Sequence, residues 1–378
     1  MKVVVAIDSL KGSLTSMEAG GAVRRGILKV RPDTEVIVKP LADGGEGTTE
    51  ALVEGLGGEM IRAEVHGPLE TQVQASYGFI RETGTAVMEM AAAAGIILVG
   101  KDKRPLDATT YGVGEMIRDA VNRGCRNFII GIGGSATNDG GTGMLEALGY
   151  EFLDEKDRPV GLGAKVLKNI VRVRTDRVMP ELKECRFQIV CDVTNPLCGT
   201  NGATWIYGPQ KGVTESLRDE LDQALGSFAE VTKECTGTDF AQAEGAGAAG
   251  GLGFAFLSYL KGELKPGIEL VLEVIKMEEA MEGADLVFTG EGRLDEQTAM
   301  GKAPTGIGKL AKKHGAKVVA LAGCIDDGAE KCNEEGIDAY FPILRRILTL
   351  DEAMKSEVAA ENMEKTAEQV FRLAVAMR

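Results

Sequence analysis

Short apolar runs rich in β-branched residues alternate with longer segments of helical periodicity along the 378-residue chain, and this alternation constrains the fold more than any other feature. The runs are mostly continuous, which is typical of strands buried on both faces of a parallel sheet. The pattern therefore predicts an α/β protein. The expected strands are 3–7, 35–39, 128–130, 187–190, 286–288 and 318–321, and the expected helices include 15–31, 109–123, 214–232 and 304–314.

The segment from Thr71 to Met90 departs from this pattern, because it predicts a hairpin closed by a glycine-containing turn. A purely parallel sheet has no need of a hairpin, and a chain of this length favours two domains. We expect one α/β domain built from both chain ends, 1–66 plus 284–378, and a second, mixed α/β domain, 67–283, inserted between them. A cleft between two such domains suits an enzyme that closes over a small molecule, and the active site is expected there.

Composition excludes several classes of function. The net charge of −14 argues against nucleic acid or an anionic membrane as a partner. No segment approaches the roughly 20 apolar residues of a membrane-spanning helix, and the N-terminal apolar run is too short for a signal peptide, so we expect a cytoplasmic protein. The 7 cysteines form no C-x-x-C pair, and His66 and His314 are the only histidines, which leaves little material for a zinc site or a Ser-His-Asp triad.

The segment GIGGSATNDGG, residues 131–141, follows an expected strand. Glycines at that place usually deliver backbone N–H groups to an anion. The first six residues fit the dinucleotide fingerprint G-x-G-x-x-A, and Glu151 lies twenty residues beyond Gly131, so NAD is one hypothesis. It is weakened because no helical pattern begins directly after the fingerprint. The P-loop and protein-kinase signatures are absent from the sequence.

The pattern D-G-G-x-G-x-x-E-A-L occurs twice, beginning at Asp43 and at Asp139. One explanation is a helix N-terminus built twice in the same way, with the aspartate near the cap. Whether or not this explanation holds, each copy is expected to direct free N–H groups and a carboxylate to one spot. A phosphate and its Mg²⁺ need those groups.

Polar residues follow two of the expected strands. Asp8, Ser9 and Lys11 come after the first strand, and the carboxyl ends of strands are where open α/β sheets bind ligands. Lys11 suits a phosphate or carboxylate, although all three residues also fit an ordinary surface turn. Asp192 and Asn195 come after strand 187–190. Asp192 could accept a hydroxyl proton or hold Mg²⁺, and Asn195 could bind metal or a nucleotide phosphate; an Asx-turn is the alternative.

A third group, Glu291, Arg293 and Asp295, follows strand 286–288. An arginine fork fits a substrate carboxylate, and acids fit a metal or a sugar hydroxyl. We therefore expect a functional loop at this place.

Taken in order, seven motifs resemble the bacterial glycerate kinase family over nearly the whole chain. No single motif is decisive, but their joint order is specific. Leu10 stands where the family commonly has Phe, and Glu296 where a small residue is common; neither departure changes a group assigned to chemistry. The motifs are DSLKGSL (8–14), ADGGEGT (42–48), GIGGSATNDGG (131–141), CDVTNP (191–196), GPQKG (208–212), GAGAAGG (245–251) and TGEGR (289–293).

The resemblance implies ATP-dependent phosphorylation of D-glycerate by a two-domain enzyme. Its chain ends would form a flavodoxin-like domain with a parallel sheet. ATP and Mg²⁺ are the implied cofactors, and 2-phosphoglycerate is expected as the product rather than 3-phosphoglycerate. A homo-oligomer is left open.

Phosphoryl transfer needs N–H nests, a lysine, acids for Mg²⁺ and a base near the hydroxyl. Lys11 is predicted to neutralise the transferred group and Asp192 to be the base, while Arg293 holds the glycerate carboxylate. The full predicted substrate set is Asp8, Ser9, Asp43, Glu291, Arg293 and Asp295, with Asp43 as a metal or substrate carboxylate. The predicted ATP set is Gly133, Gly134, Ser135, Thr137, Asn138, Asp139 and Asn195, and the predicted Mg²⁺ ligands are Asp139 and Asp192.

Two other classes of protein stay open. An NAD-dependent oxidoreductase acting on a small hydroxy acid is favoured only by the fingerprint at Gly131. A non-catalytic protein that binds a small ligand would also use glycine-rich loops. The acids and Lys11 beside the expected phosphate loops count against it, because pure binding needs no poised base.

Overall fold

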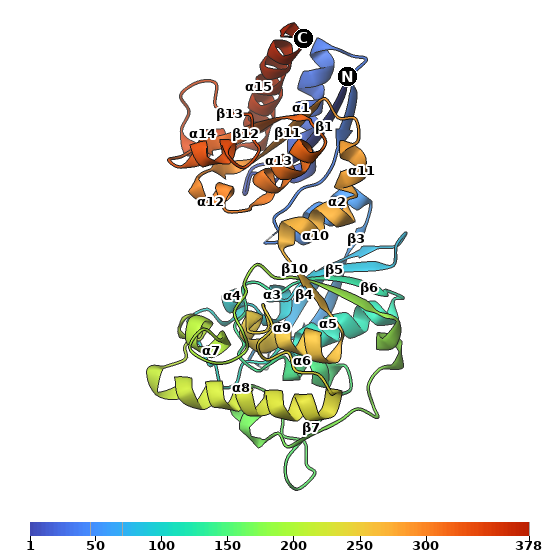
Figure 1. Ribbon diagram of the computed structural model, residues 1–378, viewed down its shortest axis with the longest axis vertical. Coiled ribbons are helices and arrows are strands. Elements are labelled where there is room, and N and C mark those ends of the chain that lie inside the picture. Colours follow the sequence, from blue (N-terminus) through green and yellow to red (C-terminus); the bar gives the residue numbers. More distant parts are fainter. Residues whose placement is uncertain (46, 70, 378) are drawn as a thin grey trace. The chain divides into compact units, whose positions relative to one another are not determined.

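The computed structural model describes residues 1–45, 47–69 and 71–377, and the chain divides into two compact units. Unit 1 consists of residues 1–57 and 267–378, and unit 2 of residues 58–266. Both chain ends, marked N and C in Figure 1, belong to unit 1.

Unit 1 contains a five-stranded sheet in which every pair of neighbours is parallel. In chain order its strands have the arrangement 2-1-3-4-5, which is the flavodoxin-like order. The predicted α/β fold, with a parallel sheet built from both chain ends, is confirmed. Across the sheet the strands are β13 (Ala339–Pro342), β12 (Lys317–Ile325), β11 (Leu286–Leu294), β1 (Lys2–Ile7) and β2 (Glu35–Val38).

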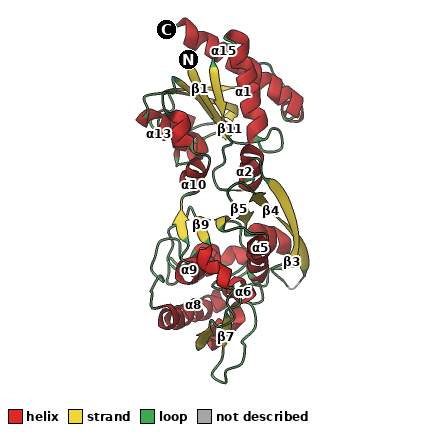
Figure 2. Ribbon diagram, turned by 90° about the vertical axis from the view of Figure 1, so that its right-hand side faces the viewer, coloured by secondary structure: helices red, strands yellow, loops and turns green. Residues whose placement is uncertain are grey.

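Helices flank this sheet, as Figure 2 shows. The first begins at a capping box, in which Thr15 accepts from the N–H of Glu18 and Glu18 accepts from the N–H of Thr15. The helices are α1 (Ser16–Val30), α2 (Thr48–Leu56), α10 (Gly267–Val274), α11 (Met277–Met281), α12 (Glu296–Ala299), α13 (Ala303–Lys313), the 3₁₀ helix η4 (Ala329–Asn333), α14 (Leu350–Ala353) and α15 (Ser356–Ala376).

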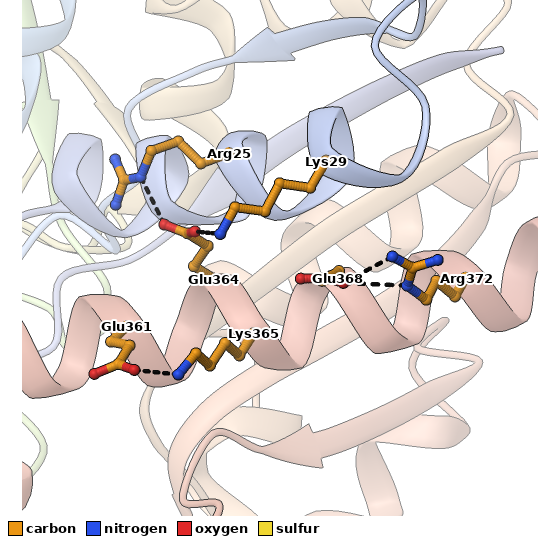
Figure 3. Close-up of polar contacts among 7 residues, drawn as sticks. All are labelled: Arg25, Lys29, Glu361, Glu364, Lys365, Glu368 and Arg372. Carbon is orange, nitrogen blue, oxygen red and sulfur yellow. Dashed lines mark hydrogen bonds and ion pairs between the residues drawn. The ribbon is translucent and has the colours of Figure 1, made fainter.

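Helices α1 and α15 pack side by side with their backbones in close contact. The cause is Gly26, since a Cβ atom there would lie 2.3 Å from the carbonyl oxygen of Glu364. Arg25 and Lys29 of α1 also pair with the Glu364 carboxylate, as Figure 3 shows, with Arg25 Nε 2.8 Å from Oε2. Exposed pairs of this kind contribute little, so the close backbone packing matters more. Figure 3 also draws two ion pairs within α15, Glu361–Lys365 and Glu368–Arg372.

Unit 2 contains a mixed six-stranded sheet. Its first two pairings in chain order, β3–β4 and β4–β5, are antiparallel, and the remaining three are parallel. The hairpin predicted at 71–90 is the pair β4–β5. Across the sheet the strands are β10 (Glu263–Lys265), β9 (Arg186–Val190), β6 (Asn127–Gly131), β5 (Thr85–Glu89), β4 (Gln72–Ile80) and β3 (Glu59–His66), and a separate pair is β7 (Glu151–Leu153) with β8 (Arg172–Arg174).

The core of unit 2 is aromatic where its sheet meets its helices. Phe128 of β6 stacks on Phe187 of β9 with ring centroids 4.8 Å apart. Among the residues that the structure describes, no helix is both long and apolar enough to cross a membrane. The helices of unit 2 are α3 (Ala91–Ala94), α4 (Ile96–Val99), α5 (Tyr111–Asn122), α6 (Thr142–Ala147), η1 (Ala164–Asn169), η2 (Pro180–Glu184), α7 (Ala203–Tyr207), η3 (Pro209–Lys211), α8 (Glu215–Thr236) and α9 (Ala248–Tyr259).

The limits of the two units differ from the domain boundaries expected at 66/67 and 283/284. Strand β3 pairs with β4 over its whole length, so residues 59–66 belong to unit 2. Helices α10 and α11 contact α13, so residues 267–283 belong to unit 1. Strand pairing and helix packing decide these limits, and neither can be read from local pattern alone.

We expect Gly26→Ala to lower the free energy of unfolding by about 1 to 3 kcal/mol, because the added methyl group forces α1 away from the α15 backbone. Gly21→Ala is the matched control in the same helix, since its nearest neighbour would be Arg25 Nη1 at 3.7 Å. The control should be neutral or gain up to about 1 kcal/mol from helix propensity. Urea unfolding of both variants measures the difference, and equal stabilities would contradict this account of the α1–α15 contact.

Candidate active site

The carboxyl end of the unit 1 sheet brings Asp8 and Glu291 together. Ile7 is paired with Gly290 in parallel register, and the N–H of Asp8 donates to the Gly290 carbonyl at 2.8 Å. Asp8 therefore follows β1, and Glu291 lies in the adjacent strand β11, directly after the residue paired with Ile7. The chain order reverses between these strands, and open α/β sheets bind their ligands at such a switch point.

Asp8 lies in a cluster of interacting charges. Burial raises the pKa of its carboxyl to about 7; an N–H bond from Ser9, at 2.6 Å, opposes the rise. The negative charges of Asp43 and Glu291 raise that pKa further, while Lys11 lowers it. Five of the predicted residues thus occupy one neighbourhood, and Asp8 is held near the midpoint of its titration at neutral pH.

Glu291 is restrained from the side of α12. Its carboxylate accepts a hydrogen bond from Thr298 Oγ1 at 2.6 Å. Burial raises the pKa of Glu291, and the Thr298 bond and the charge of Lys302 act in the opposite direction. Glu291 is therefore positioned firmly, with its charge partly compensated.

Lys11 is exposed and lines a cavity of about 430 Å³ between the β1–α1 connection and α2. Ser9 lies on the same wall. Three glutamates line the cavity, Glu18, Glu50 and Glu54, against the single lysine. The cavity is thus net acidic and does not favour a polyphosphate inside it, so Lys11 is better placed to meet one anionic group at the rim.

Arg293 and Asp295 occupy a different setting from the one expected. Strand β11 continues to Leu294, paired with β12, so TGEGR belongs to a strand and the prediction of a loop there is wrong. Arg293 is exposed, with Nε 3.2 Å from Asp295 Oδ2. Asp295 also caps α12 by accepting the N–H groups of Gln297 and Thr298. Its carboxylate has a structural task, whereas the guanidinium of Arg293 faces solvent.

The two copies of D-G-G-x-G share one turn and then diverge. Asp43 Oδ1 accepts the N–H of Gly45 at 2.9 Å, and Asp139 Oδ1 accepts the N–H of Gly141 at 3.1 Å. However, α2 begins after Gly47, four residues beyond its aspartate, whereas α6 begins directly after Gly141. Each copy therefore leads into a helix through a left-handed glycine, as one helix N-terminus built twice requires, but the helix starts two residues later in the first copy. Glu46 of the first copy lies outside the described residues.

The first half of the glycine-rich segment, residues 131–136, offers free backbone donors. Gly133 and Gly134 are exposed. Among the described residues, no acceptor is found for the N–H groups of Gly133, Gly134 and Ser135. The segment 94–96 fixes their position, since Ile96 N donates to Gly134 O at 2.8 Å and Ala136 N to Ala94 O at 2.9 Å. Consecutive free N–H groups in a turn can bind an anion, and we call residues 133–135 the nest.

The second half, residues 137–139, turns its side chains inward. Thr137, Asn138 and Asp139 are each 0% exposed. Asp139 Oδ2 accepts from the N–H and hydroxyl of Thr110 at 2.8 and 2.9 Å, and from Gly143 N at 3.3 Å. Burial raises the pKa of Asp139 and these bonds oppose the rise. The Asp139 carboxylate thus shapes the loop, and its contacts do not fit the predicted role as a metal or phosphate contact.

Asp192 lies at the same sheet edge as the nest. Gly131 of β6 is paired with Val190 of β9, so Gly133 and Asp192 each come two residues after a paired position. Asp192 is exposed. Asn195 differs, because its Oδ1 accepts from the Tyr207 hydroxyl at 2.6 Å and its Nδ2 donates to the Asn201 carbonyl at 2.8 Å. Both ends of that amide are occupied within the chain, which favours a structural role.

Sequence reasoning missed Lys211. Its side chain is 2% exposed, and Nζ donates to the Thr137 carbonyl at 2.6 Å. Burial lowers the pKa of Lys211 to about 7, although the charge of Asp139 raises it in part. In the sequence, GPQKG has the composition of an exposed turn, so only the burial of the segment distinguishes this lysine from a surface one.

The described residues contain no group of three His, Cys, Asp or Glu side chains arranged to hold a metal ion. Mg²⁺ bound with a nucleotide commonly uses only one or two carboxylates, the phosphates supplying the other ligands. Asp192 fits that requirement because it is exposed beside the nest, whereas Asp139 does not.

A nest of free N–H groups in unit 2, and an acid cluster with a lysine at the switch point of the unit 1 sheet, are groups of the kind that phosphoryl transfer requires. The sequence profile of the Glycerate kinase family matches residues 3–375. The chain belongs to this family, whose members transfer a phosphoryl group to a hydroxyl acceptor. The predicted family and enzyme class are confirmed, and the oxidoreductase and non-catalytic alternatives find no support.

Individual relatives agree over nearly their full lengths. The glycerate kinase of Halalkalibacterium halodurans is 45% identical over 96% of this chain and 97% of its own. The glycerate 2-kinase of Escherichia coli K12 is 44% identical over 100% and 99%. A crystal structure of a Salmonella typhimurium LT2 protein assigned as glycerate kinase 2 has a TM-score of 0.90 at 39% identity and covers 100% of this chain and 98% of its own.

We expect Asp8→Asn to change the pH dependence of stability. The carboxyl titrates at about 7 when folded and at 3.8 in its unperturbed form, so between these values the folded chain binds more protons and wild-type stability falls as pH rises. The variant should match the wild type near pH 4 and exceed it by about 2 to 4 kcal/mol at pH 8. Urea unfolding from pH 4 to 8 measures this, with exposed Asp33→Asn as control; a constant offset would show that Asp8 does not titrate in this range.

Proposed function

We propose that the protein transfers the terminal phosphoryl group of ATP to D-glycerate, with 2-phosphoglycerate as the product. The main observation that supports this proposal is the row of free N–H groups at Gly133, Gly134 and Ser135, which suits the phosphates of a nucleotide. The name of the Escherichia coli relative, glycerate 2-kinase, supports the regiochemistry. ATP, Mg²⁺ and a cytoplasmic location are parts of the same proposal.

In this proposal, residues of both units serve one reaction. The nest of unit 2 binds the nucleotide phosphates. In unit 1, Lys11 neutralises the transferred group and the exposed fork of Arg293 binds the substrate carboxylate, while Ser9 and Asp43 orient its hydroxyls. Mg²⁺, when bound, supplies positive charge to the phosphate oxygens, and Asp192 is the side chain that would hold it.

Two carboxylates are candidates for the base that accepts the proton of the substrate hydroxyl. Asp192 is the candidate from the sequence, and its exposure beside the nest supports it. Asp8 is supported by its cluster and by the burial that raises its pKa to about 7, a value that suits a general base at neutral pH. The two candidates predict different pH profiles.

The first test is ADP release from ATP and Mg²⁺ in the presence of D-glycerate, coupled through enolase and pyruvate kinase without phosphoglycerate mutase. Only 2-phosphoglycerate feeds enolase directly, so we expect a signal without mutase. A signal that requires mutase would assign the 3-hydroxyl. The absence of any signal from folded protein, with and without mutase, would overturn the proposal.

Lys11→Met and Asp192→Asn should each lower kcat by about 100-fold or more, because charge neutralisation and proton transfer each contribute at least that much. Both side chains are exposed, so the melting temperatures should stay close to wild type. Lys309→Met, at another exposed lysine of unit 1, is the control. Wild-type turnover in either variant, or loss of folding, would refute the role of that residue.

Comparison of Asp8→Asn with Asp192→Asn identifies the base. If Asp8 is the base, the wild-type kcat/KM should fall below pH of about 7, and this limb should vanish in the residual activity of Asp8→Asn but persist in that of Asp192→Asn. The reverse result would assign the proton transfer to Asp192.

A further inference from the structure

Lys211 is a buried cation that the mechanism above does not use. Lysine is almost never fully buried unless it is paired, yet this side chain is 2% exposed and ends beneath the glycine-rich segment. Its Nζ donates to the carbonyl oxygen of Thr137 at 2.6 Å. Thr137 comes two residues after Ser135, the last residue of the nest. Lys211 therefore holds the backbone that leads directly out of the nest.

A neighbouring contact from the same part of the chain holds the next residue. Asn138 Nδ2 donates to Thr204 Oγ1 at 3.0 Å, and both groups are buried. Thr204 lies in α7, which is followed at once by the 3₁₀ helix η3 that ends at Lys211. Segment 203–211 thus fixes two consecutive residues of the loop.

The glycine-rich segment 248–251 packs on the same stretch of the loop. Gly140 N donates to Gly250 O at 2.9 Å, and a Cβ atom at Gly250 would lie 2.1 Å from the Thr137 carbonyl oxygen. The Thr137 carbonyl therefore has little freedom to move. This packing assigns the 245–253 segment a supporting role beneath the loop.

The charge of Lys211 has a counterpart in Asp139. The negative charge of Asp139 acts on Lys211 and opposes the effect of burial on its pKa. The Asp139 carboxylate already accepts hydrogen bonds from Thr110, Gly141 and Gly143, so it does not need Lys211 as a donor. A neutral donor would satisfy the Thr137 carbonyl equally well. What lysine adds, in its protonated form, is positive charge two residues along the chain from a row of N–H groups that lack acceptors.

We propose that Lys211 is a positioning residue for nucleotide binding: its ammonium group fixes the Thr137 carbonyl and places a buried positive charge beneath the nest at 133–135. Nucleotide affinity, rather than the chemical step, then depends on Lys211. The inference rests on the proposed function of the nest as the site for ATP phosphates.

Two variants separate the charge from the hydrogen bond. Lys211→Met removes both, and Lys211→Gln keeps a neutral donor. We expect the KM and Kd for ATP to rise about tenfold or more in each variant, because a hydrogen bond from a charged group contributes that much. The kcat and the KM for D-glycerate should change less than about threefold. Wild-type ATP affinity in Lys211→Gln would overturn the role of the charge.

The position of the loop is tested separately by amide hydrogen exchange without nucleotide. Lys211→Met should exchange faster at residues 133–139, with melting and the rest of unit 2 near wild type. Lys168→Met, at an exposed lysine paired with Glu220, is the matched control and should change neither exchange nor ATP affinity. Unchanged exchange in Lys211→Met would overturn the positioning role. If Lys211→Met does not fold, the ATP affinity of Lys211→Gln decides the role of the charge.

The failure of this inference can be told from the failure of the proposed function. If the wild type binds ATP by calorimetry but transfers no phosphoryl group to D-glycerate, the proposed function is wrong, and the ATP affinities of the Lys211 variants still decide the inference. If the wild type does not bind ATP, both are wrong.

Discussion

The parallel pairing of β1 with β11 is the constraint on which unit 1 depends. Val3–Ile7 lie beside Leu286–Gly290, which joins two segments far apart in the sequence. Closing so long a loop costs entropy, although the cost grows only slowly with length. All of Val3–Ile7 are 0% exposed, and burial of this apolar run offsets the cost. Without this pairing, Asp8 and Glu291 would not be brought close together.

In unit 2, two charged side chains at the glycine-rich segment 131–141 are buried. Asp139 at 0% exposure and Lys211 at 2% both lose their hydration on folding. Burying opposite charges seldom adds stability, because the free-energy cost of desolvation offsets most of their attraction. The hydrogen bonds that Asp139 accepts from Thr110 and from the start of α6 offset part of this desolvation cost. These contacts restrict the loop, and a restricted nest loses less entropy when an anion binds.

The sequence predicted the fold class and most elements because their signals are local. Continuous apolar runs identified the central strands, and helical periodicity located α1, α5, α8 and α13. The limits of the two units could not be predicted, because β3 is partly exposed and is identified as a strand of unit 2 only by its pairing with β4. The length of β11 was missed for a related reason: Gly290, Gly292 and Arg293 do not look like strand residues, and pairing with β12 makes them so.

The sequence indicated where candidate site residues lie along the chain, but it did not indicate what each side chain does. Asp8 and Asp192 do follow the ends of β1 and β9, and topology brings the carboxyl ends of neighbouring parallel strands to one edge, but their roles stay predictions. Roles depend on what packs around each side chain. Asn195 and Asp295 have the chemistry of ligands, yet their polar atoms bond within the chain. Lys211 has the pattern of a surface residue, yet it is buried.

The two D-G-G-x-G copies show what such a motif can and cannot specify. Each aspartate accepts the N–H two residues ahead, so the motif specifies a turn wherever it occurs. At Asp43 the carboxylate is half-buried and takes part in the charge cluster around Asp8. At Asp139 the N-terminal end of α5 supplies the donors of Thr110, and the same carboxylate becomes an internal support. Because these donors come from a distant part of the sequence, the same ten-residue pattern produces a half-buried acid in one unit and a fully buried one in the other.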